Sequence, residues 1–295
     1  MSGGNRWRVI MLLVIVVMVG IWVREIKEKN KIEVIFCDVK QGDGIIVKEG
    51  SHQMVVDVGP KNKEMGRCLN KHLPFWDKKL EVVILTHEDS DHVGGLGEVE
   101  RYYRIERLMG GPAESEQINY TDFLSAFDVI RMGKIEFEVL SPSTSSGQAP
   151  STSSGQAPST SSGQVPSTSS GQAPSTSSGQ AGDKNSNSVV GELRVGGKRF
   201  LLMGDADAET EERLVWRNIL APAGDKLNYL KVSHHGSKDG TTNTLLEVIK
   251  PEVAIISVGK NWYGHPSEEV LERLSGVGAE IWRTDERGDI KIEVD

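Results

Sequence analysis

Short apolar runs alternate with polar, glycine-bearing segments along most of the chain. Runs of this length, bounded by turn residues, predict β-strands. The predicted strands cover residues 32–36, 45–47, 54–56, 81–85, 105–109, 127–140, 189–195, 199–203, 229–232, 253–258, 281–283 and 290–294. Helices are predicted at residues 65–73, 94–103, 208–220 and 244–250, and after Ser267, which suits an N-cap. The pattern therefore predicts a domain that mixes strands and helices.

The N-terminus carries a different pattern, because residues 9–23 are almost unbroken apolar sequence. Fifteen residues are short for a membrane span, which usually takes about 20. Trp7 and Trp22 nevertheless suit the two membrane interfaces, and no small-residue cleavage site follows Val23. We predict that residues 1–30 are an uncleaved signal anchor, with a cleaved signal peptide as the alternative. The rest of the chain is then membrane-anchored and extracytoplasmic, or secreted if the segment is cleaved.

An octapeptide, PSTSSGQA, recurs five times over residues 142–181, with one change at Val165. It contains no aromatic residue and no charge, so it cannot offset the entropy lost on ordering. Lengthening a surface loop costs little, about 0.6 kcal/mol for each doubling. We therefore predict one domain over residues 31–295, interrupted by a disordered insertion at 142–181.

The chain has 295 residues and a formal net charge of −8, and 37% of its residues are hydrophobic. The acidic balance argues against a surface that coats nucleic acid broadly. It still allows a nucleic-acid substrate at a metal site, because bound cations reverse the local field. Cys37 and Cys68 lack metal-like spacing. Cys37 is predicted to be a small core residue, and a disulfide between the two cysteines stays open.

Four residues of metal-ligand type follow the predicted strand at 81–85, namely His87, Asp89, Asp91 and His92. A strand end fixes the backbone, so the loop that follows can aim several side chains at one point. Imidazole and carboxylate groups together suit Zn, Mn or Fe, and two carboxylates favour a site for more than one cation. We therefore predict a metal site in this loop.

Other ligand-type residues also follow predicted strands: Asp205, then His234 and His235, then His265. Strand ends gathered at one rim of a packed sheet would bring these side chains together with the first loop. His265 is either a proton donor and phosphate-binding group or a structural loop histidine. The adjacent Trp262 and Tyr263 either stack on a base or pack beneath their loop.

These motifs resemble those of the metallo-β-lactamase superfamily. His87-x-Asp89-x-Asp91-His92 with Gly94-Gly95 resembles the HxHxDH signature, except that Asp89 stands where the second His usually stands. That departure is similar to the hydrolase domain of ComEC-type DNA-uptake proteins, as are five other loops. They are Gln41-Gly42-Asp43, Asn187-Ser188, Leu202-Met203-Gly204-Asp205-Ala206, Lys231-Val232-Ser233-His234-His235-Gly236-Ser237 and Tyr263-Gly264-His265-Pro266. The resemblance covers residues 32–295, apart from the insertion.

The resemblance implies an α+β fold, a four-layer αββα sandwich with the metal site at one rim. The implied ligands are His87 and Asp89 at a first metal, Asp91 and His92 at a second, Asp205 between both, and His234 completing the second, with His235 as the alternative. Two divalent ions, Zn or Mn, are implied. Many superfamily members place a separate histidine before the bridging aspartate, and this chain lacks it, so we expect a weaker first site.

The implied chemistry is hydrolysis by a water that two cations activate. The catalytic residues would be Asp91, Asp205 and His265, and the substrate-binding residues would be Asn187, Ser188, Ser237, Tyr263 and His265. We predict a phosphodiesterase or nuclease, with single-stranded DNA as the candidate substrate.

Two alternatives stay open: a hydrolase of another ester or amide bond, and a non-catalytic module that binds DNA or another polymer. A full ComEC-type protein has many membrane helices, whereas this chain has at most one. A role in DNA uptake would therefore need a separate channel protein as partner.

Overall fold

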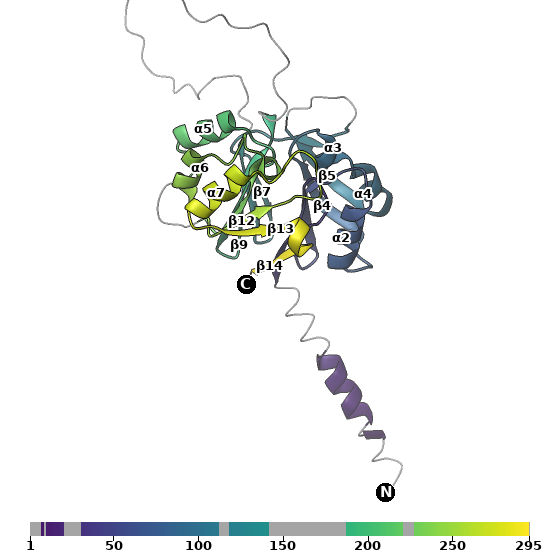
Figure 1. Cartoon of the computed structure of the whole chain (residues 1–295). Helices are drawn as coiled ribbons and strands as arrows, with labels where there is room; N and C mark the ends of the chain where they lie inside the picture. The colour runs from purple at the N-terminus through teal and green to yellow at the C-terminus, as the bar shows by residue number, and fades with distance from the viewer. Residues whose placement is uncertain are drawn as a thin grey trace, which may run out of the picture.

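The computed structural model describes residues 7–8, 10–20, 31–111, 118–141, 187–220 and 227–294. Two seven-stranded sheets lie face to face, and helices cover the outer face of each (Figure 1). Helices α5, α6 and α7 lie at the left of that view and α2 and α4 at the right, with the sheets between them. The predicted α+β fold with two sheets is therefore confirmed.

The first sheet has the strand order β14-β1-β2-β3-β4-β5-β6. Its strands are β1 (Ile32–Phe36), β2 (Gly44–Glu49), β3 (His52–Val58), β4 (Lys79–Leu85), β5 (Arg104–Gly110), β6 (Asp122–Phe123) and β14 (Ile290–Val294). β1 is antiparallel to β14 and β2, whereas β3 to β6 are parallel neighbours. The carboxyl ends of β3 and β4 therefore meet at the same edge.

The second sheet has the order β13-β12-β11-β10-β9-β8-β7. Its strands are β7 (Val129–Met132), β8 (Ile135–Ser141), β9 (Val190–Val195), β10 (Lys198–Leu202), β11 (Tyr229–Lys231), β12 (Val253–Ile256) and β13 (Glu280–Arg283). β7 to β10 are antiparallel, and β10 to β13 are parallel. Every predicted strand is present, and the long run at 127–140 forms the hairpin of β7 and β8.

The helices are α2 (Glu64–His72), α3 (Ser90–Val93), α4 (Leu96–Tyr102), α5 (Ala208–Trp216), α6 (Asn243–Ile249), α7 (Glu268–Gly276) and α8 (Thr284–Arg287). The predicted N-cap of the last long helix is confirmed, because the Ser267 side chain accepts a hydrogen bond from Val270 N. The helix predicted at 94–103 is present as α4, and a separate short helix, α3, precedes it. Asp91 and His92 consequently lie on α3 rather than in a loop.

Three apolar clusters hold the four layers together. One lies between the sheets and includes Phe36, Phe137 and Phe200, each 0–1% exposed. A second joins the second sheet to α5, α6 and α7, and a third joins the first sheet to α2 and α4. Burial of both faces of each sheet explains why strands such as Val82–Leu85 within β4 read as continuous apolar runs.

A disulfide joins Cys37, directly after β1, to Cys68 on α2. The pairing that the sequence left open is therefore present, and both cysteines are also core residues, 0% and 3% exposed. The two cysteines are 31 positions apart. Closing a loop of that length restricts the unfolded chain and thereby stabilises the folded state by about 3–4 kcal/mol.

Two predictions concern segments at the margins of the structure. Residues 7–8 and 10–20 are helical, and 21–30 lie outside the described residues. Among the helices in the described parts of the chain, none combines the length and the apolar character needed to cross a membrane. The octapeptide insertion at 142–181 also lies outside the described residues, so its disorder and the domain boundaries stay predictions. Its flanks are β8 and β9, which pair through Ser141 and Val190.

Candidate metal centre

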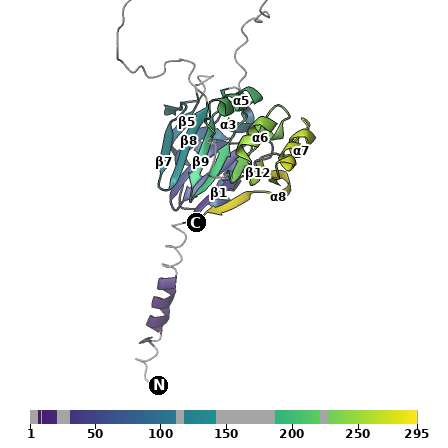
Figure 2. The same cartoon turned by 90° about the vertical axis from the view of Figure 1, so that its left-hand side faces the viewer.

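Side chains from the carboxyl ends of strands in both sheets meet at one end of the domain. β4 is followed by His87 and then α3, β10 by Asp205, and β11 by a short 3₁₀ helix, η2 (Ser233–Gly236). Val189 N donates a hydrogen bond to Thr86 O at 2.8 Å and joins the two sheets there. In Figure 2, α3 and α5 lie at this end and the C-terminus at the opposite end. The predicted convergence of strand ends is therefore present.

Asp205 lies at the centre of the site and is 2% exposed. Its Oδ2 is 3.7 Å from Nε2 of His87 and 3.7 Å from Nε2 of His234. Its Oδ1 is 3.2 Å from Nε2 of His92 and 3.8 Å from Nε2 of His235. Each carboxylate oxygen thus faces its own pair of imidazoles.

Two further carboxylates complete the pattern, one on each side of Asp205. Oδ2 of Asp89 is 3.8 Å from Nε2 of His87, and Oδ2 of Asp91 is 3.3 Å from Nε2 of His235. We call the group of His87, Asp89, His234 and Asp205 the first position. The group of Asp91, His92, His235 and Asp205 is the second position.

The backbone of η2 separates the two neighbouring histidines. His234 and His235 have φ values of 45° and 53°, in the left-handed region. Their rings are consequently 6.1 Å apart and inclined at 74°, so they lie on opposite sides of Asp205. His234 therefore lies at the first position and not at the second, where the resemblance put it. The geometry gives the second position to His235, the alternative.

Hydrogen bonds fix which nitrogen of each buried imidazole faces the centre. Nδ1 of His92 lies 2.8 Å from Asp57 Oδ2, and Nδ1 of His235 lies 2.8 Å from Ser257 O. In the neutral imidazole each Nδ1 thus carries the proton, so Nε2 is the nitrogen that can bind a cation. The Nε2 atoms of His87, His92 and His235 and Oδ1 of Asp205 are buried without a hydrogen-bond partner. Buried donor atoms that converge in this way fit divalent cations.

Three residues behind the ligands were not assigned from the sequence: Asp43, Asp57 and Lys231. Asp57 ends β3 and accepts hydrogen bonds from Thr86 N and Thr86 Oγ1 at 2.8 and 2.7 Å, besides its contact with His92. The fully buried Lys231 pairs with Asp43 and donates to Gly204 O at 3.2 Å. The sequence signal of Asp43 and Asp57 was a single acidic residue between glycines or near a strand end, which is weak alone, and Lys231 was one basic residue in a strand.

The buried charges set the protonation of the ligands. Burial and the positive charge of His92 lower the pKa of His87 to about 4. Burial alone would lower the pKa of His92, but the Asp205 and Asp57 carboxylates outweigh it and raise that pKa well above its ordinary value. Burial raises the pKa of Asp91, but the contact with His235 Nε2 at 3.3 Å and the charge of His92 outweigh it and lower that pKa to about 2. Asp91 and Asp205, whose pKa values are both lowered, are therefore ionised at neutral pH.

A cleft of about 560 Å³ opens onto the two positions. Its outer wall is the loop after β12, which contributes Lys260, Trp262, Tyr263 and His265. Trp262 is 91% and Tyr263 66% exposed, so the alternative in which they pack beneath the loop is wrong. The ring of His265 lies 5.5 Å from that of His234, and its Nδ1 is buried without a hydrogen-bond partner. Burial and the neighbouring histidines lower the pKa of His265.

The other proposed substrate-binding residues lie outside the cleft wall. Ser188 is 0% exposed, and its Oγ accepts a hydrogen bond from Asp205 N at 3.1 Å, so it supports the central carboxylate. Ser237 is 3% exposed and contacts Asp239. Asn187 is exposed but does not line the cleft. Of the five predicted residues, the structure places Tyr263 and His265 where a substrate would lie.

The two sheets with outer helices, and a carboxylate that faces two pairs of imidazoles at their rim, fit the class of metal-dependent hydrolases. The chain belongs to the metallo-beta-lactamase superfamily, whose family model matches residues 38–260. Members of this superfamily are generally metal-dependent hydrolases.

Three curated relatives are competence and recombination proteins. The chain is 28% identical to ComE operon protein 3 of Bacillus subtilis (strain 168), covering 88% of this chain and 32% of the relative. It is 27% identical to Recombination protein 2 of Haemophilus influenzae, covering 86% and 28%, and 25% identical to Competence protein ComA of Neisseria gonorrhoeae, covering 90% and 32%. The resemblance to DNA-uptake proteins is thus confirmed. The chain spans about a third of the length of these relatives.

Solved structures show the same fold at low identity. The metallo-beta-lactamase fold protein YhfI from Bacillus subtilis matches with a TM-score of 0.54 and 10% identity, covering 89% of this chain and 99% of that one. CmlA, a diiron beta-hydroxylase from Streptomyces venezuelae, matches with a TM-score of 0.54 and 9% identity, covering 90% and 54%. At these identities the likeness shows the fold alone.

Proposed function

We propose that this chain is a metal-dependent phosphodiesterase that cleaves nucleic acid, with single-stranded DNA as its substrate. One observation carries the proposal: the two oxygens of Asp205 face separate pairs of imidazoles, and the Nε2 atoms of His87, His92 and His235 are buried there without a hydrogen-bond partner. Two divalent cations held there would supply an activated water and neutralise charge on a phosphoryl group. The relatives' names, which refer to competence and recombination, support DNA as the substrate.

The protein's own contribution is to hold the ligands and the substrate in place. Asp57 and Ser257 orient His92 and His235 so that Nε2 of each faces the centre. His265 is held by the loop, since His265 N donates to Asn261 Oδ1 at 3.1 Å and His265 O accepts from Asn261 Nδ2 at 2.8 Å. With its lowered pKa, His265 is neutral at pH 7 and can donate one N–H to a phosphate oxygen or a leaving group.

The rim of the cleft supports a polymeric nucleic acid rather than a small ester. Trp262 and Tyr263 present exposed rings 6.2 Å apart beside the site. Exposed aromatic rings stack on unpaired bases, and each stacked base contributes about 1–3 kcal/mol. Lys260, on the same rim, would pair with a backbone phosphate. A single strand with splayed bases fits this combination.

The proposal also covers the cellular location of the domain. The apolar side chains of residues 10–19 are 50–66% exposed, so the described domain does not cover them. We propose that this N-terminal segment anchors the chain to a membrane, with the domain outside the cytoplasm; cleavage would instead release it. The Cys37–Cys68 disulfide supports an oxidising compartment. DNA uptake would then require a separate channel protein.

The test is hydrolysis by the full chain, purified in detergent and loaded with Mn²⁺ or Zn²⁺. We expect it to cleave bis(p-nitrophenyl) phosphate and a single-stranded oligonucleotide. If the loaded protein cleaves only lactams, thioesters or lactones, it is a hydrolase of another bond and not a phosphodiesterase. A chain that stays metal-free after exposure to both ions would favour a non-catalytic binding module.

A further inference from the structure

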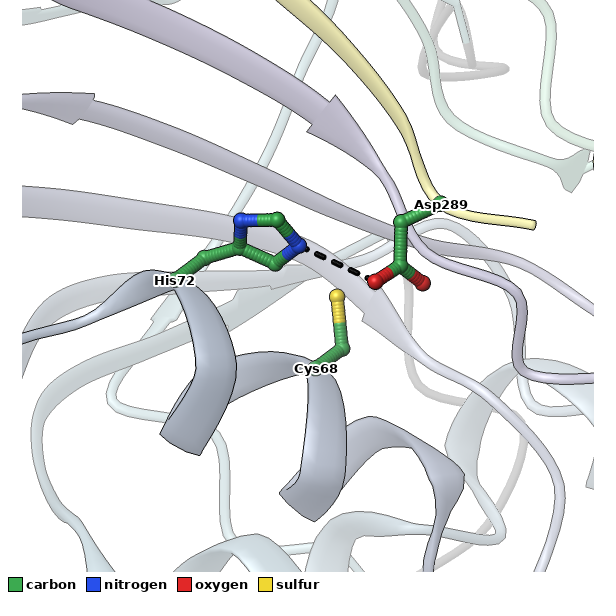
Figure 3. A group of neighbouring side chains, drawn as sticks. All are labelled: Cys68, His72 and Asp289. Carbon is green, nitrogen blue, oxygen red and sulfur yellow. Dashed lines mark hydrogen bonds and ion pairs between the residues drawn. The ribbon is translucent and has the colours of Figure 1, made fainter. Parts of the chain in front are cut away.

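A second group of ligand-type side chains lies where α2 meets the start of β14. The sulfur of Cys68, a ring nitrogen of His72 and a carboxylate oxygen of Asp289 all lie within 4.8 Å of one another. Cys68 and His72 stand four residues apart on α2, so their side chains share one face of the helix. Figure 3 shows the three side chains pointing toward one another, with His72 Nε2 3.0 Å from Asp289 Oδ2.

Cys37 lies next to this group, because its sulfur is bonded to that of Cys68 in the oxidised chain. Metals bind the thiolate form of cysteine, so the disulfide withholds both sulfurs from an ion. Reduction would free both sulfurs beside the imidazole and the carboxylate. This is a complete set of four tetrahedral ligands of the kinds that Zn²⁺ takes.

The dimensions suit such an ion. With Zn–ligand bonds of about 2.0–2.3 Å, tetrahedral ligands lie about 3.3–3.8 Å from one another. The three ligand atoms are already within 4.8 Å, so the side chains need only a small contraction. The side chains of His72 and Asp289 are each 12% exposed, which gives an ion a route from solvent.

We propose that the reduced chain binds one Zn²⁺ through Cys37, Cys68, His72 and Asp289. The disulfide and the metal site are then alternative cross-links at the same place, which we call the clasp. In the first step a dithiol reductant gives two electrons to the bond between the sulfurs. That bond breaks, two cysteine thiols form, and the reductant becomes a disulfide. Zn²⁺ then binds both sulfurs as thiolates, and the two thiol protons pass to solvent. This inference is independent of the proposed function.

Two contacts of Asp289 Oδ2 must yield to the ion, the direct contact with His72 Nε2 at 3.0 Å and an ion pair with Lys71. Lys71 Nζ lies 2.7 Å from Asp289 Oδ2. The Lys71 side chain is 64% exposed, and an ion pair at that exposure contributes little, typically about 0–1 kcal/mol. A cation at the clasp replaces the positive charge of Lys71 beside the carboxylate. Asp289 Oδ1 meanwhile stays on Asp38 N, at 3.0 Å.

Either cross-link would hold the same two elements. Cys37 begins the loop that leads from β1 to Asp43, behind the second position of the metal centre. Asp38 N is hydrogen-bonded to Asp289, so the start of this loop is attached to the clasp at two points. The domain would keep this loop on α2 in both reducing and oxidising compartments.

The test uses Co²⁺ in place of Zn²⁺, because thiolate–cobalt bonds give an intense charge-transfer band in the near ultraviolet. The chain has two cysteines, and the ligands of the candidate metal centre include neither, so the band reports only the clasp. We expect the full chain reduced with a phosphine, with Co²⁺ in excess, to show a band of the intensity of one thiolate-bound Co²⁺ per chain, and the oxidised chain to lack it. Asp91→Ala should leave the band unchanged. A reduced chain without the band overturns the proposal.

A second variant covers the case in which the reduced chain unfolds. Cys37→Ser frees Cys68 without any reductant, and we expect it to show a band of about half the intensity, from one thiolate. Adding His72→Ala to this variant should weaken Co²⁺ binding by at least about tenfold. No band in Cys37→Ser, or the same affinity with and without His72, would contradict the proposed site.

Discussion

The two positions on either side of Asp205 differ in how their ligands are held. At the second position, His92 and His235 are 0% and 1% exposed, and each Nδ1 has a hydrogen-bond acceptor at 2.8 Å. At the first position, the side chains of Asp89 and His234 are 38% and 34% exposed to the cleft. The second position is therefore preorganised, whereas the first position can adjust its ligands when a substrate arrives. We infer that the second position binds its ion more tightly.

The largest effect should come from the residue that both positions share. Asp205→Asn removes one negative charge and one oxygen donor from between the two clusters. We expect both ions to be lost and phosphodiester hydrolysis to fall by about a thousandfold or more. Metal content and turnover of bis(p-nitrophenyl) phosphate measure this. Glu209→Gln, the same chemical change at an exposed position on α5, is the matched control and should retain both ions.

Substitutions of His234 and His235 should have the next largest effect on activity. They also distinguish the two positions, because His234 lies at the first and His235 at the second. We expect His235→Ala to lose one ion and about a hundredfold in activity, since it removes a buried ligand. His234→Ala should lose about tenfold and recover at high metal concentration, since it removes an exposed ligand of the first position. Titration of each variant with Mn²⁺ under turnover measures both effects. Greater damage from His234→Ala would reverse the ranking of the two positions.

A smaller effect should follow when only the orientation of a ligand is disturbed. In Asp57→Asn the acceptor of the His92 Nδ1 proton loses its charge but keeps its shape. We expect metal affinity at the second position to fall by about 10–100-fold. Competition with a chelator measures this affinity. His234→Ala should lose the ion of the first position. If Asp57→Asn loses that same ion most easily, the assignment of Asp57 to the second position is wrong.

The smallest effect concerns pH. Because its pKa is about 4, His87 is a neutral imidazole at pH 7, so an ion at the first position does not compete with protonation of His87. The pKa values of His92 and His235 are raised, so an ion at the second position must displace protons. Affinity at the second position should therefore rise with pH through neutrality, whereas His87 contributes no pH dependence at the first position above about pH 5. Calorimetry in buffers of different ionisation enthalpy would count the protons released.

Much of the site was predictable from the sequence, because its ligands follow strand ends that apolar runs reveal. His87, Asp91, His92 and Asp205 are of this kind. The choice between His234 and His235 depends on left-handed backbone conformations at both residues, which residue types alone do not specify. Asp57 and Lys231 act through contacts across 35 and 27 positions, with His92 and Gly204 respectively, and such contacts leave no local pattern.

The fold was predictable for the same reason, since strands with buried faces are apolar throughout. The disulfide was not, because nothing in a spacing of 31 positions shows that the end of β1 lies against α2. The short helix α3, which directly precedes α4, also escaped prediction. A Cβ at Gly95 would lie 2.1 Å from Val58 O, so α4 begins where the backbone passes close to β3.

The pairing of β8 with β9 has a consequence for how this gene can vary. Ser141, directly before the octapeptide insertion, and Val190, nine positions after it, are partners in that ladder, so the sheet holds a residue on each side of the insertion. Replication slippage within an exact repeat adds or removes whole units and keeps the reading frame. After each such event the chain would still enter and leave the insertion through the same pair of strand residues. Alleles with different repeat numbers should therefore share one metal centre, and repeat number can drift as a neutral length polymorphism.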